Sequence, residues 1–289
     1  MTAPVVGFVG LGAMGAPMVR QLLAHDFVVV GANRSQGIVE TLAAEGMAPA
    51  VDAREVATRS DVVLCALPDV DTVKTVATMI ADVGRAGQIV IEHSTVSPQL
   101  ARDHAALFAA HGIGFLDAPV SGGPAGAIAG TLTVMVGGEE STLNDARSVL
   151  EAFGNPIRHC GVVGSGQAVK LINQLLVGVH TAVSAEAAAL GRALGVTETL
   201  LAEVIGTSFG ASTMLLRNLP RFNTSDFTPA TPVRLLEKDL GLVAHEGDTA
   251  SVALPLTAVA ARLFGDAAAQ GLRDQDMAVL IELWRRSNP

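Results

Sequence analysis

VVGFVGLGAMGAPMVRQLLAH, residues 5–25, decides the fold. Residues 5–10 are apolar and rich in valine, which predicts a buried strand. The glycine pattern G-x-G-x-x-G overlaps its end, as Gly10, Leu11, Gly12, Ala13, Met14 and Gly15, and a helical pattern follows. A strand, a glycine turn and a helix in this order are typical of an α/β dinucleotide-binding domain.

Each glycine of the turn has a separate physical use. Gly10 permits the tight turn, Gly12 lets backbone N–H groups approach a pyrophosphate, and Gly15 lets helix and strand pack closely. The positive end of the helix dipole then faces the phosphates. The pattern alone also fits a glycine-rich turn without a ligand, so the prediction of a cofactor site depends on the segments that follow.

A second apolar run, residues 27–32, ends about 20 residues after the glycines, where the adenosine ribose of a dinucleotide lies. NAD-selective domains usually place a carboxylate there, whereas this chain has Asn33, Arg34 and Ser35. A guanidinium and a hydroxyl can bind a 2′-phosphate, so we predict NADP as cofactor, with NAD as the alternative. Arg34 could also be a solvated loop residue.

Further strands are predicted at 61–67 and 88–93, with helices at 69–81 and after Ser97-Pro98, an N-cap and N1 pair. Ligands of open α/β sheets bind beyond the carboxyl ends of the strands. Leu67, Pro68 and Thr95 are therefore expected to line the cofactor, while His93 is interpreted as a packed or loop residue.

The segment DAPVSGG, residues 117–123, follows a short apolar run at 114–116. It could be a flexible connection, but we interpret Ser121, Gly122 and Gly123 as a cradle for a carboxylate, because backbone N–H groups freed by glycines can wrap an anion. A strand at 131–138 and a helix at 139–153 are expected next.

From about residue 164 the strand patterns end. Helical patterns occupy 168–193, 197–206, 212–219, 231–247 and 254–269, with a shorter one at 274–286. The predicted fold class is α/β: an N-terminal Rossmann dinucleotide-binding domain, residues 1–162, joined by a long helix to a C-terminal all-helical domain, residues 163–289.

The long helix carries the most informative ionisable residue. Lys170 and Asn173 are spaced i, i+3, so both side chains project from one face. The segment is apolar enough to raise the question of a membrane span, but Lys170, Asn173, His180 and Glu186 favour a helix at the centre of a soluble protein.

Composition narrows the partners. A net charge of −9 and a pI near 5.2 disfavour nonspecific nucleic-acid binding. Two cysteines far apart, Cys65 and Cys160, and no export or targeting signal indicate a cytoplasmic protein with free thiols. We find no cluster with metal-ligand spacing and expect no metal. The apolar helices at 168–193 and 254–269 suggest a subunit interface.

Four motifs in order carry a family resemblance: GFVGLGAMGAPM at 7–18, DAPVSGGPAGAIAGTL at 117–132, GSGQAVKLINQ at 164–174 and KDLGL at 238–242. With them the chain resembles the β-hydroxyacid dehydrogenase family, which includes 3-hydroxyisobutyrate dehydrogenases, tartronate semialdehyde reductases, other short-chain aldehyde-acid reductases and threonate dehydrogenases. The resemblance implies an NAD(P)-dependent enzyme that transfers hydride between the nicotinamide and a short 3-hydroxy carboxylic acid, in a homodimer or homotetramer. From the net charge and the polar residues of the long helix we expect neither a nucleic-acid nor a membrane partner.

The resemblance also implies roles for individual residues. Lys170 matches the catalytic lysine, the general acid or base, and Asn173 matches the amide that helps to hold the substrate. Ser121, Gly122 and Gly123 match the loop that binds the substrate carboxylate. Leu67, Pro68, Thr95 and Lys238 match cofactor contacts, although Lys238 could instead pair with Asp239 or Glu237 on its own helix.

The substrate within the family stays open. Many 3-hydroxyisobutyrate enzymes have a second Asn where this chain has Gln174, and KLINQLLVGVH with KDLGLV looks closer to the threonate and tartronate semialdehyde branches. Asn33, Arg34 and Ser35 look more like the NADP-preferring reductases. Imine reductases are similar but replace the lysine, and a non-catalytic nucleotide-binding protein would not need Lys170 and Asn173.

Overall fold

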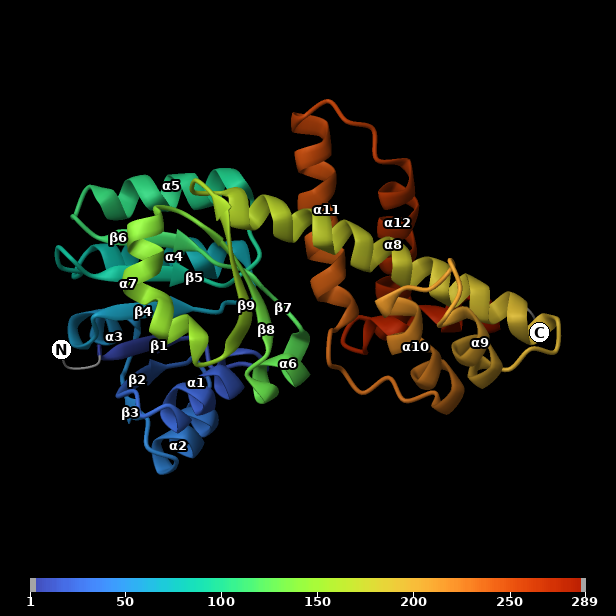
Figure 1. The fold of residues 1–289 in the computed structure, drawn as a ribbon, viewed down its shortest axis with the longest axis horizontal. Coiled ribbons are helices and arrows are strands. Elements are labelled where there is room, and N and C mark those ends of the chain that lie inside the picture. Colours follow the sequence, from blue (N-terminus) through green and yellow to red (C-terminus); the bar gives the residue numbers. More distant parts are fainter. Residues whose placement is uncertain (1–3, 287–289) are drawn as a thin grey trace. The chain divides into compact units, whose positions relative to one another are not determined.

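The computed structural model describes residues 4–286. The chain divides into two compact units, Met1–Lys170 and Leu171–Pro289. The long helix α8, Ser165–Ala193, runs through this division (Figure 1). The predicted fold class, a Rossmann domain followed by a helical domain, is confirmed.

The N-terminal unit is built on one sheet, which has nine strands within the described residues. The order is β3-β2-β1-β4-β5-β6-β8-β7, with β9 paired to β8. Strands β3 to β6 are parallel, whereas β8 is antiparallel to β6 and β7 and parallel to β9. Their bounds are β1 Val6–Val9, β2 Val29–Ala32, β3 Ala48–Pro49, β4 Val62–Cys65, β5 Ile89–Glu92, β6 Gly114–Asp117, β7 Val120–Ser121, β8 Leu132–Gly137 and β9 Gly154–Gly161.

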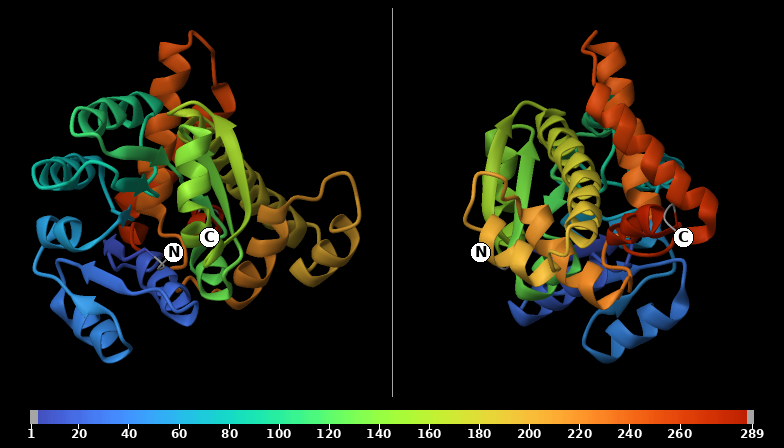
Figure 2. Two further views of the ribbon diagram at one scale, coloured as in Figure 1. Left: turned by 60° about the vertical axis from the view of Figure 1, so that its left-hand side comes forward. Right: turned by 90° about the vertical axis from the view of Figure 1, so that its right-hand side faces the viewer.

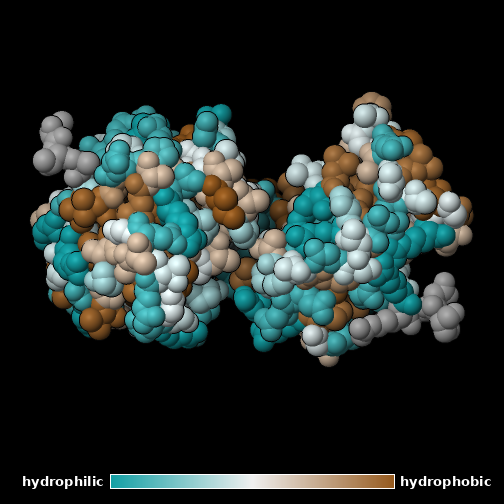
Figure 3. Space-filling view, turned by 90° about the horizontal axis from the view of Figure 1, so that it is seen from below, coloured by the Kyte–Doolittle hydropathy of each residue, from teal (hydrophilic) through white to brown (hydrophobic). Residues whose placement is uncertain are grey.

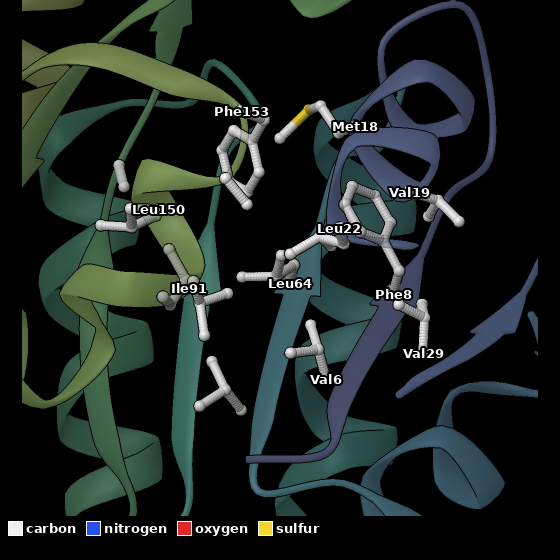
Figure 4. Close-up of a cluster of buried hydrophobic side chains, with 14 of the residues drawn as sticks. Val6, Phe8, Met18, Val19, Leu22, Val29, Leu64, Ile91, Leu150 and Phe153 are labelled. Atoms are coloured by element: carbon white, nitrogen blue, oxygen red, sulfur yellow. The ribbon is translucent and has the colours of Figure 1, made fainter. Parts of the chain in front are cut away.

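Both faces of this sheet are covered, because successive residues of each central strand point to opposite sides. One core joins Phe8 and Leu64 to α1 (Gly15–Ala24), α2 (Gln36–Ala44) and α7 (Glu140–Glu151). Figure 4 shows part of it, with Phe8, Leu22, Leu64 and Phe153 gathered on one side of the strands. The other core joins Val9, Val63 and Cys65 to α3 (Ala53–Arg59), α4 (Val70–Ala81) and α5 (Pro98–Ala109).

The predicted strands and helices of this unit are confirmed, with ends that differ by one or two residues. Six elements were not predicted: the helices α2, α3 and α6 (Gly123–Ala129), the short strands β3 and β7, and the strand β9. The pattern of β9, GNPIRHCG, is polar and contains Pro156, and most of the strand is only partly buried. The segment 117–123, interpreted as a loop, contains β7 and the start of α6.

The regular secondary structure of the C-terminal unit is helical within the described residues. After α8 it contains α9 Glu198–Ile205, α10 Thr213–Thr224, α11 Val233–Thr249, α12 Pro255–Ala267, a π turn at Ala268–Leu272, a 3-10 turn at Met277–Ile281 and α13 Glu282–Arg286. Its core includes Phe222, Leu236, Leu240, Phe264 and Leu280. Helices α11 and α12 lie side by side (Figure 2).

One predicted helix end in this unit is wrong. The pattern at 212–219 stops at Pro220, but α10 continues to Thr224 with the proline inside it. Leu219 and Phe222, on either side of Pro220, are buried in the core of the unit. Packing of these side chains therefore outweighs the hydrogen bond that proline cannot donate.

Candidate active site

The glycine turn after β1 has the geometry that the sequence predicts. Gly10 has φ +97°, and a Cβ there would lie 2.3 Å from the carbonyl oxygen of Ala66. A Cβ on Gly15 would lie 1.9 Å from the carbonyl oxygen of Gly10, so both positions require glycine for the chain itself. Gly12 differs: its added Cβ meets nothing within 4 Å, and the residue is exposed. The protein does not use the space in front of Gly12.

Asn33 holds this turn in place. Its Oδ1 accepts a hydrogen bond from the backbone N–H of Leu11 at 3.1 Å, and its Nδ2 donates to the carbonyl of Ser35 at 3.2 Å. Arg34 and Ser35 are exposed, and Ser35 precedes α2 without capping it through its hydroxyl. Asn33 therefore supports the turn, while Arg34 and Ser35 face solvent.

The ends of β4 and β5 are joined by Ser94. Its Oγ accepts from the backbone N–H of Leu67 at 2.7 Å, and its own N–H donates to Glu92 Oε1 at 2.8 Å. Leu67 and Thr95 are half-buried and Pro68 is exposed. Both segments thus follow the carboxyl ends of parallel strands, where the sequence predicts cofactor contacts.

Lys170 lies in the second turn of α8, and only 8% of its surface is exposed. Its Nζ donates to the carbonyl of Val120 at 2.9 Å. Val120 and Ser121 pair with Val134 and Thr133 of β8, and Gly122 and Gly123 follow with φ +132° and +61°. The structure brings the amine beside the segment that the sequence singles out as an anion cradle.

Asp117, at the end of β6, was not assigned a role from the sequence. It is fully buried, and its two carboxylate oxygens accept the backbone N–H groups of Gly164 and Gln167 at 2.7 and 2.8 Å. Burial raises the pKa of Asp117, and these backbone N–H groups oppose the rise. An aspartate directly after an apolar strand was a signal in the sequence, but its partners lie 47 and 50 residues away.

His93 is a packed residue, as interpreted from the sequence. Its Nδ1 lies 2.6 Å from the carbonyl oxygen of Ala118, and its ring meets that of Phe153 edge-on. Burial lowers the pKa of His93 to about 4. The ring is therefore neutral at pH 7 and contributes to packing. Cys65, also predicted to be a core residue, is buried, and burial raises the pKa of its thiol.

The C-terminal unit contributes a polar chain of its own. Asn173 Nδ2 donates to Gln174 Oε1 at 2.9 Å, and Gln174 Nε2 donates to Asp239 Oδ2 at 2.6 Å. Lys238 Nζ lies 3.1 Å from Asp239 Oδ1, which agrees with one of its two interpretations. Because an ionised carboxylate only accepts, Gln174 turns its amide nitrogen to Asp239 and its oxygen to Asn173.

Within residues 4–286, no group of three His, Cys, Asp or Glu side chains is arranged to hold a metal ion. By length and composition alone α8 could cross a membrane, and 44% of its most apolar window is buried inside the protein.

The chain matches two family models that together span nearly its whole length. Residues 5–164 match the NAD binding domain of 6-phosphogluconate dehydrogenase, and residues 164–284 match a domain described as NAD-binding of NADP-dependent 3-hydroxyisobutyrate dehydrogenase.

Two curated relatives are similar along almost their whole length. The 2-(hydroxymethyl)glutarate dehydrogenase of Eubacterium barkeri is 37% identical, over 97% of this chain and 95% of the relative. The L-threonate dehydrogenase of Cupriavidus necator is 35% identical, over 96% and 95%. Among solved structures, the 3-hydroxyisobutyrate dehydrogenase of Mycobacterium tuberculosis with L-serine has a TM-score of 0.90 and 36% identity, covering 98% of this chain and 100% of that one.

Proposed function

The chain belongs to the β-hydroxyacid dehydrogenase family, and we propose that within it the enzyme interconverts a short 3-hydroxy carboxylic acid of the 3-hydroxyisobutyrate kind and its carbonyl product. The observation that carries the proposal is the buried amine of Lys170, hydrogen-bonded to Val120 beside Ser121. If the loop binds the substrate carboxylate, the buried amine lies close to the substrate hydroxyl, and proton transfer requires this proximity.

The cofactor is NAD(P), and the residues present fit it. Gly12 leaves open space that the protein itself does not need, in front of the N-terminus of α1. Backbone N–H groups at such a turn bind a pyrophosphate without net charge. The proposed cofactor contacts are Gly10, Leu11, Gly12, Ala13, Met14, Gly15, Asn33, Arg34, Ser35, Leu67, Pro68, Thr95 and Lys238.

Within NAD(P), we propose that the enzyme prefers NADP. Arg34 and Ser35 are exposed at the end of β2, and Asn33 uses its side chain to support the glycine turn. A guanidinium and a hydroxyl suit a 2′-phosphate, and no carboxylate is present among these three residues to repel it. NAD is the alternative.

The chemistry divides between the cofactor and the chain. When bound, the nicotinamide supplies or accepts the hydride. Lys170 takes the proton of the substrate hydroxyl in oxidation and returns it in reduction. Ser121, Gly122 and Gly123 bind the substrate carboxylate, and Asn173 helps to hold the substrate.

The test is a spectrophotometric screen of wild type and Lys170→Ala. Wild type is offered 3-hydroxyisobutyrate, threonate, glycerate, serine and 4-hydroxybutyrate with NADP and with NAD. We expect one of the 3-hydroxyacids with NADP to give the highest kcat/KM, and Lys170→Ala to lose about 10²-fold or more in kcat while still binding NADPH. Near-normal turnover by that variant would refute the role of the lysine.

A second candidate function is that of a threonate dehydrogenase or a tartronate semialdehyde or other aldehyde-acid reductase. Gln174 after Asn173 favours it, because the Asn173 amide then donates to Gln174 and leaves its Oδ1 available to a further hydroxyl. Higher kcat/KM for threonate or glycerate in the same screen would select this function. A third outcome concerns the carboxylate of the substrate. If the enzyme stays active on the methyl ester of its best 3-hydroxyacid, it does not need that carboxylate, which would favour an imine reductase or a simple carbonyl reductase.

The assembly is proposed as a homodimer or homotetramer of a cytoplasmic protein, with its domain boundary between residues 162 and 163. Ile172, Leu176, Val183 and Leu190 are all exposed on one stripe of α8, and hydrophobic surface is visible on the helical unit in Figure 3. Such a stripe is typical of a subunit interface.

A further inference from the structure

We infer that Asp117 is a positioning residue for Lys170: its carboxylate caps α8 from another part of the chain and fixes the lysine relative to the 120–123 segment. This inference rests on the proposed role of Lys170.

Helix α8 begins without a capping side chain of its own. The preceding residue, Gly164, has φ +91° and no side chain to accept from the first turn. The first N–H groups of a helix lack intrahelical partners, and an N-cap side chain normally accepts the N–H three residues on. Here Asp117 Oδ2 accepts the N–H of Gln167, and Oδ1 accepts that of Gly164. A carboxylate 50 residues away thus replaces the local cap.

Two glycines let Asp117 and the start of α8 come together. A Cβ on Gly137 would lie 2.4 Å from Asp117 Oδ1, so the absent side chain there makes room for the carboxylate. A Cβ on Gly166 would lie 2.4 Å from the carbonyl oxygen of Met135, 2.7 Å from that of Asp117 and 2.9 Å from Asp117 Oδ2. Neither glycine has a positive φ, so close approach, and not backbone conformation, requires glycine at both positions.

The anchor is connected to the lysine in two ways. Along α8, Lys170 follows Gln167 by three residues, about one helical turn. Along the other segment, Asp117 and Val120 are both fixed on β8, through the pairs Asp117 with Gly137 and Val120 with Val134. Because Val120 accepts from Lys170 Nζ, one rigid strand carries both the cap of the helix and the partner of the amine.

A second anchor holds the same turn. Gln167 Oε1 accepts from the N–H of Val96 at 3.1 Å, and its Nε2 donates to the carbonyl of Ser94 at 2.8 Å. This contact ties the turn to the segment after β5, whereas Asp117 ties it to the segment after β6. Loss of Asp117 therefore leaves the helix attached but free to shift relative to Val120 and Ser121.

The test compares Asp117→Asn with Asp52→Ala. Asparagine keeps the shape of the side chain but can accept only one of the two N–H groups, since its Nδ2 is a donor. Asp52 caps α3 in the same unit by accepting from the N–H of Glu55 at 3.0 Å, and α3 holds no proposed site residue. Asp52→Ala thus measures the loss of a cap without a positioning role.

All kcat values are normalised to the NADPH-binding sites titrated by fluorescence, so that unfolded protein does not count. We expect Asp117→Asn to lower kcat by about 10²-fold, the scale of a displacement near 1 Å, with little change in the dissociation constant of NADPH. Amide hydrogen exchange at Gly164 and Gln167 becomes faster in the same variant. Asp52→Ala retains the wild-type kcat.

Lys170→Ala is measured in parallel, so that two failures can be distinguished. If Lys170→Ala is active, the proposed function of the lysine is wrong. If Lys170→Ala is inactive but Asp117→Asn turns over like Asp52→Ala, the lysine keeps its role and the inference on Asp117 is overturned. The inference on Asp117 is also overturned if amide exchange at Gln167 becomes faster in Asp117→Asn without a loss in kcat, because the cap then does not position the amine of Lys170.

Discussion

The contact between Gln174 and Asp239 gives a prediction with a definite magnitude. Both residues are buried, with 7% and 5% of their surfaces exposed, and Gln174 Nε2 donates to Asp239 Oδ2 at 2.6 Å. We consider Gln174→Met and Asp239→Leu, which remove the polar groups and keep the approximate length or branching of each side chain, together with the double variant. All partners of this contact lie in the C-terminal unit, whose unfolding can be followed separately.

Each single change leaves the other group buried without its partner. Asp239→Leu strands the amide of Gln174, which costs about 1–3 kcal/mol, and also removes the ion pair with the partly exposed Lys238, which contributes less than about 1 kcal/mol. Gln174→Met removes a hydrogen bond to a charged group, which costs about 1.5–3 kcal/mol. The double variant leaves neither of these two groups without its partner. Its loss in free energy of unfolding should therefore be about 1.5–3 kcal/mol smaller than the sum of the losses in the two single variants.

The assay is urea unfolding followed by the fluorescence of Trp284, the single tryptophan of the chain, which lies in the C-terminal unit. A coupling free energy below about 0.5 kcal/mol, the limit for independent sites, would refute the reasoning.

Gln174→Met should also raise KM for the hydroxyacid, with little effect on KM for NADP, because Asn173 loses the oxygen that orients its amide.

Three further predictions concern other parts of the molecule. Because the pKa of His93 is about 4 in the folded chain and 6.5 in the unfolded one, the unfolded state alone gains a proton between these values, and lowering the pH from 6.5 to 4 should cost up to about 3 kcal/mol of stability. His93→Asn should flatten this pH dependence measured by urea unfolding, whereas replacement of the exposed His111 should not, and equal slopes in both variants would contradict the assignment. Arg34→Ala should raise KM for NADP about 10- to 100-fold, equivalent to about 1.5–3 kcal/mol for hydrogen bonds to a charged group, without raising KM for NAD; parallel changes for both cofactors would count against NADP selectivity. Leu190→Asp should reduce the mass measured by light scattering to that of one chain, while Val51→Asp, which changes a still more exposed side chain on the N-terminal unit, should leave it unchanged; an unaltered mass for Leu190→Asp would place the interface elsewhere.

Local pattern predicted much of this fold. The strands at β1, β4 and β5 are short apolar runs buried on both faces, and their composition identifies them without knowledge of their neighbours. β9 escaped prediction because it is a partly exposed strand whose place depends on pairing with β8. α10 was ended too early because the pattern shows Pro220 but not the buried Leu219 and Phe222 that hold the helix together.

The site was predictable in part for the same reason. Lys170, Ser121 and the glycine turn belong to contiguous motifs, and their residue types indicate their chemistry. The structural roles of Asp117 and Asn33 could not be predicted in this way, since both side chains accept from backbone N–H groups distant in sequence. The sequence predicts Asn33 only as a cofactor contact, whereas in the structure its side chain supports the glycine turn. The roles of the individual site residues and the boundary at 162/163 stay predictions.

The motif glycines distinguish what the chain needs for itself from what it leaves for a ligand. A Cβ on Gly10, Gly15 or Gly166 would collide with backbone atoms of the protein, so packing alone requires glycine there. Gly12 has open space and no positive φ, so a Cβ there would meet no atom of the chain. We propose that glycine is needed at this position because a dinucleotide pyrophosphate lies close to the backbone. Gly12→Val should accordingly weaken NADPH binding without lowering the thermal stability of the apo protein, whereas Gly15→Val should lower both.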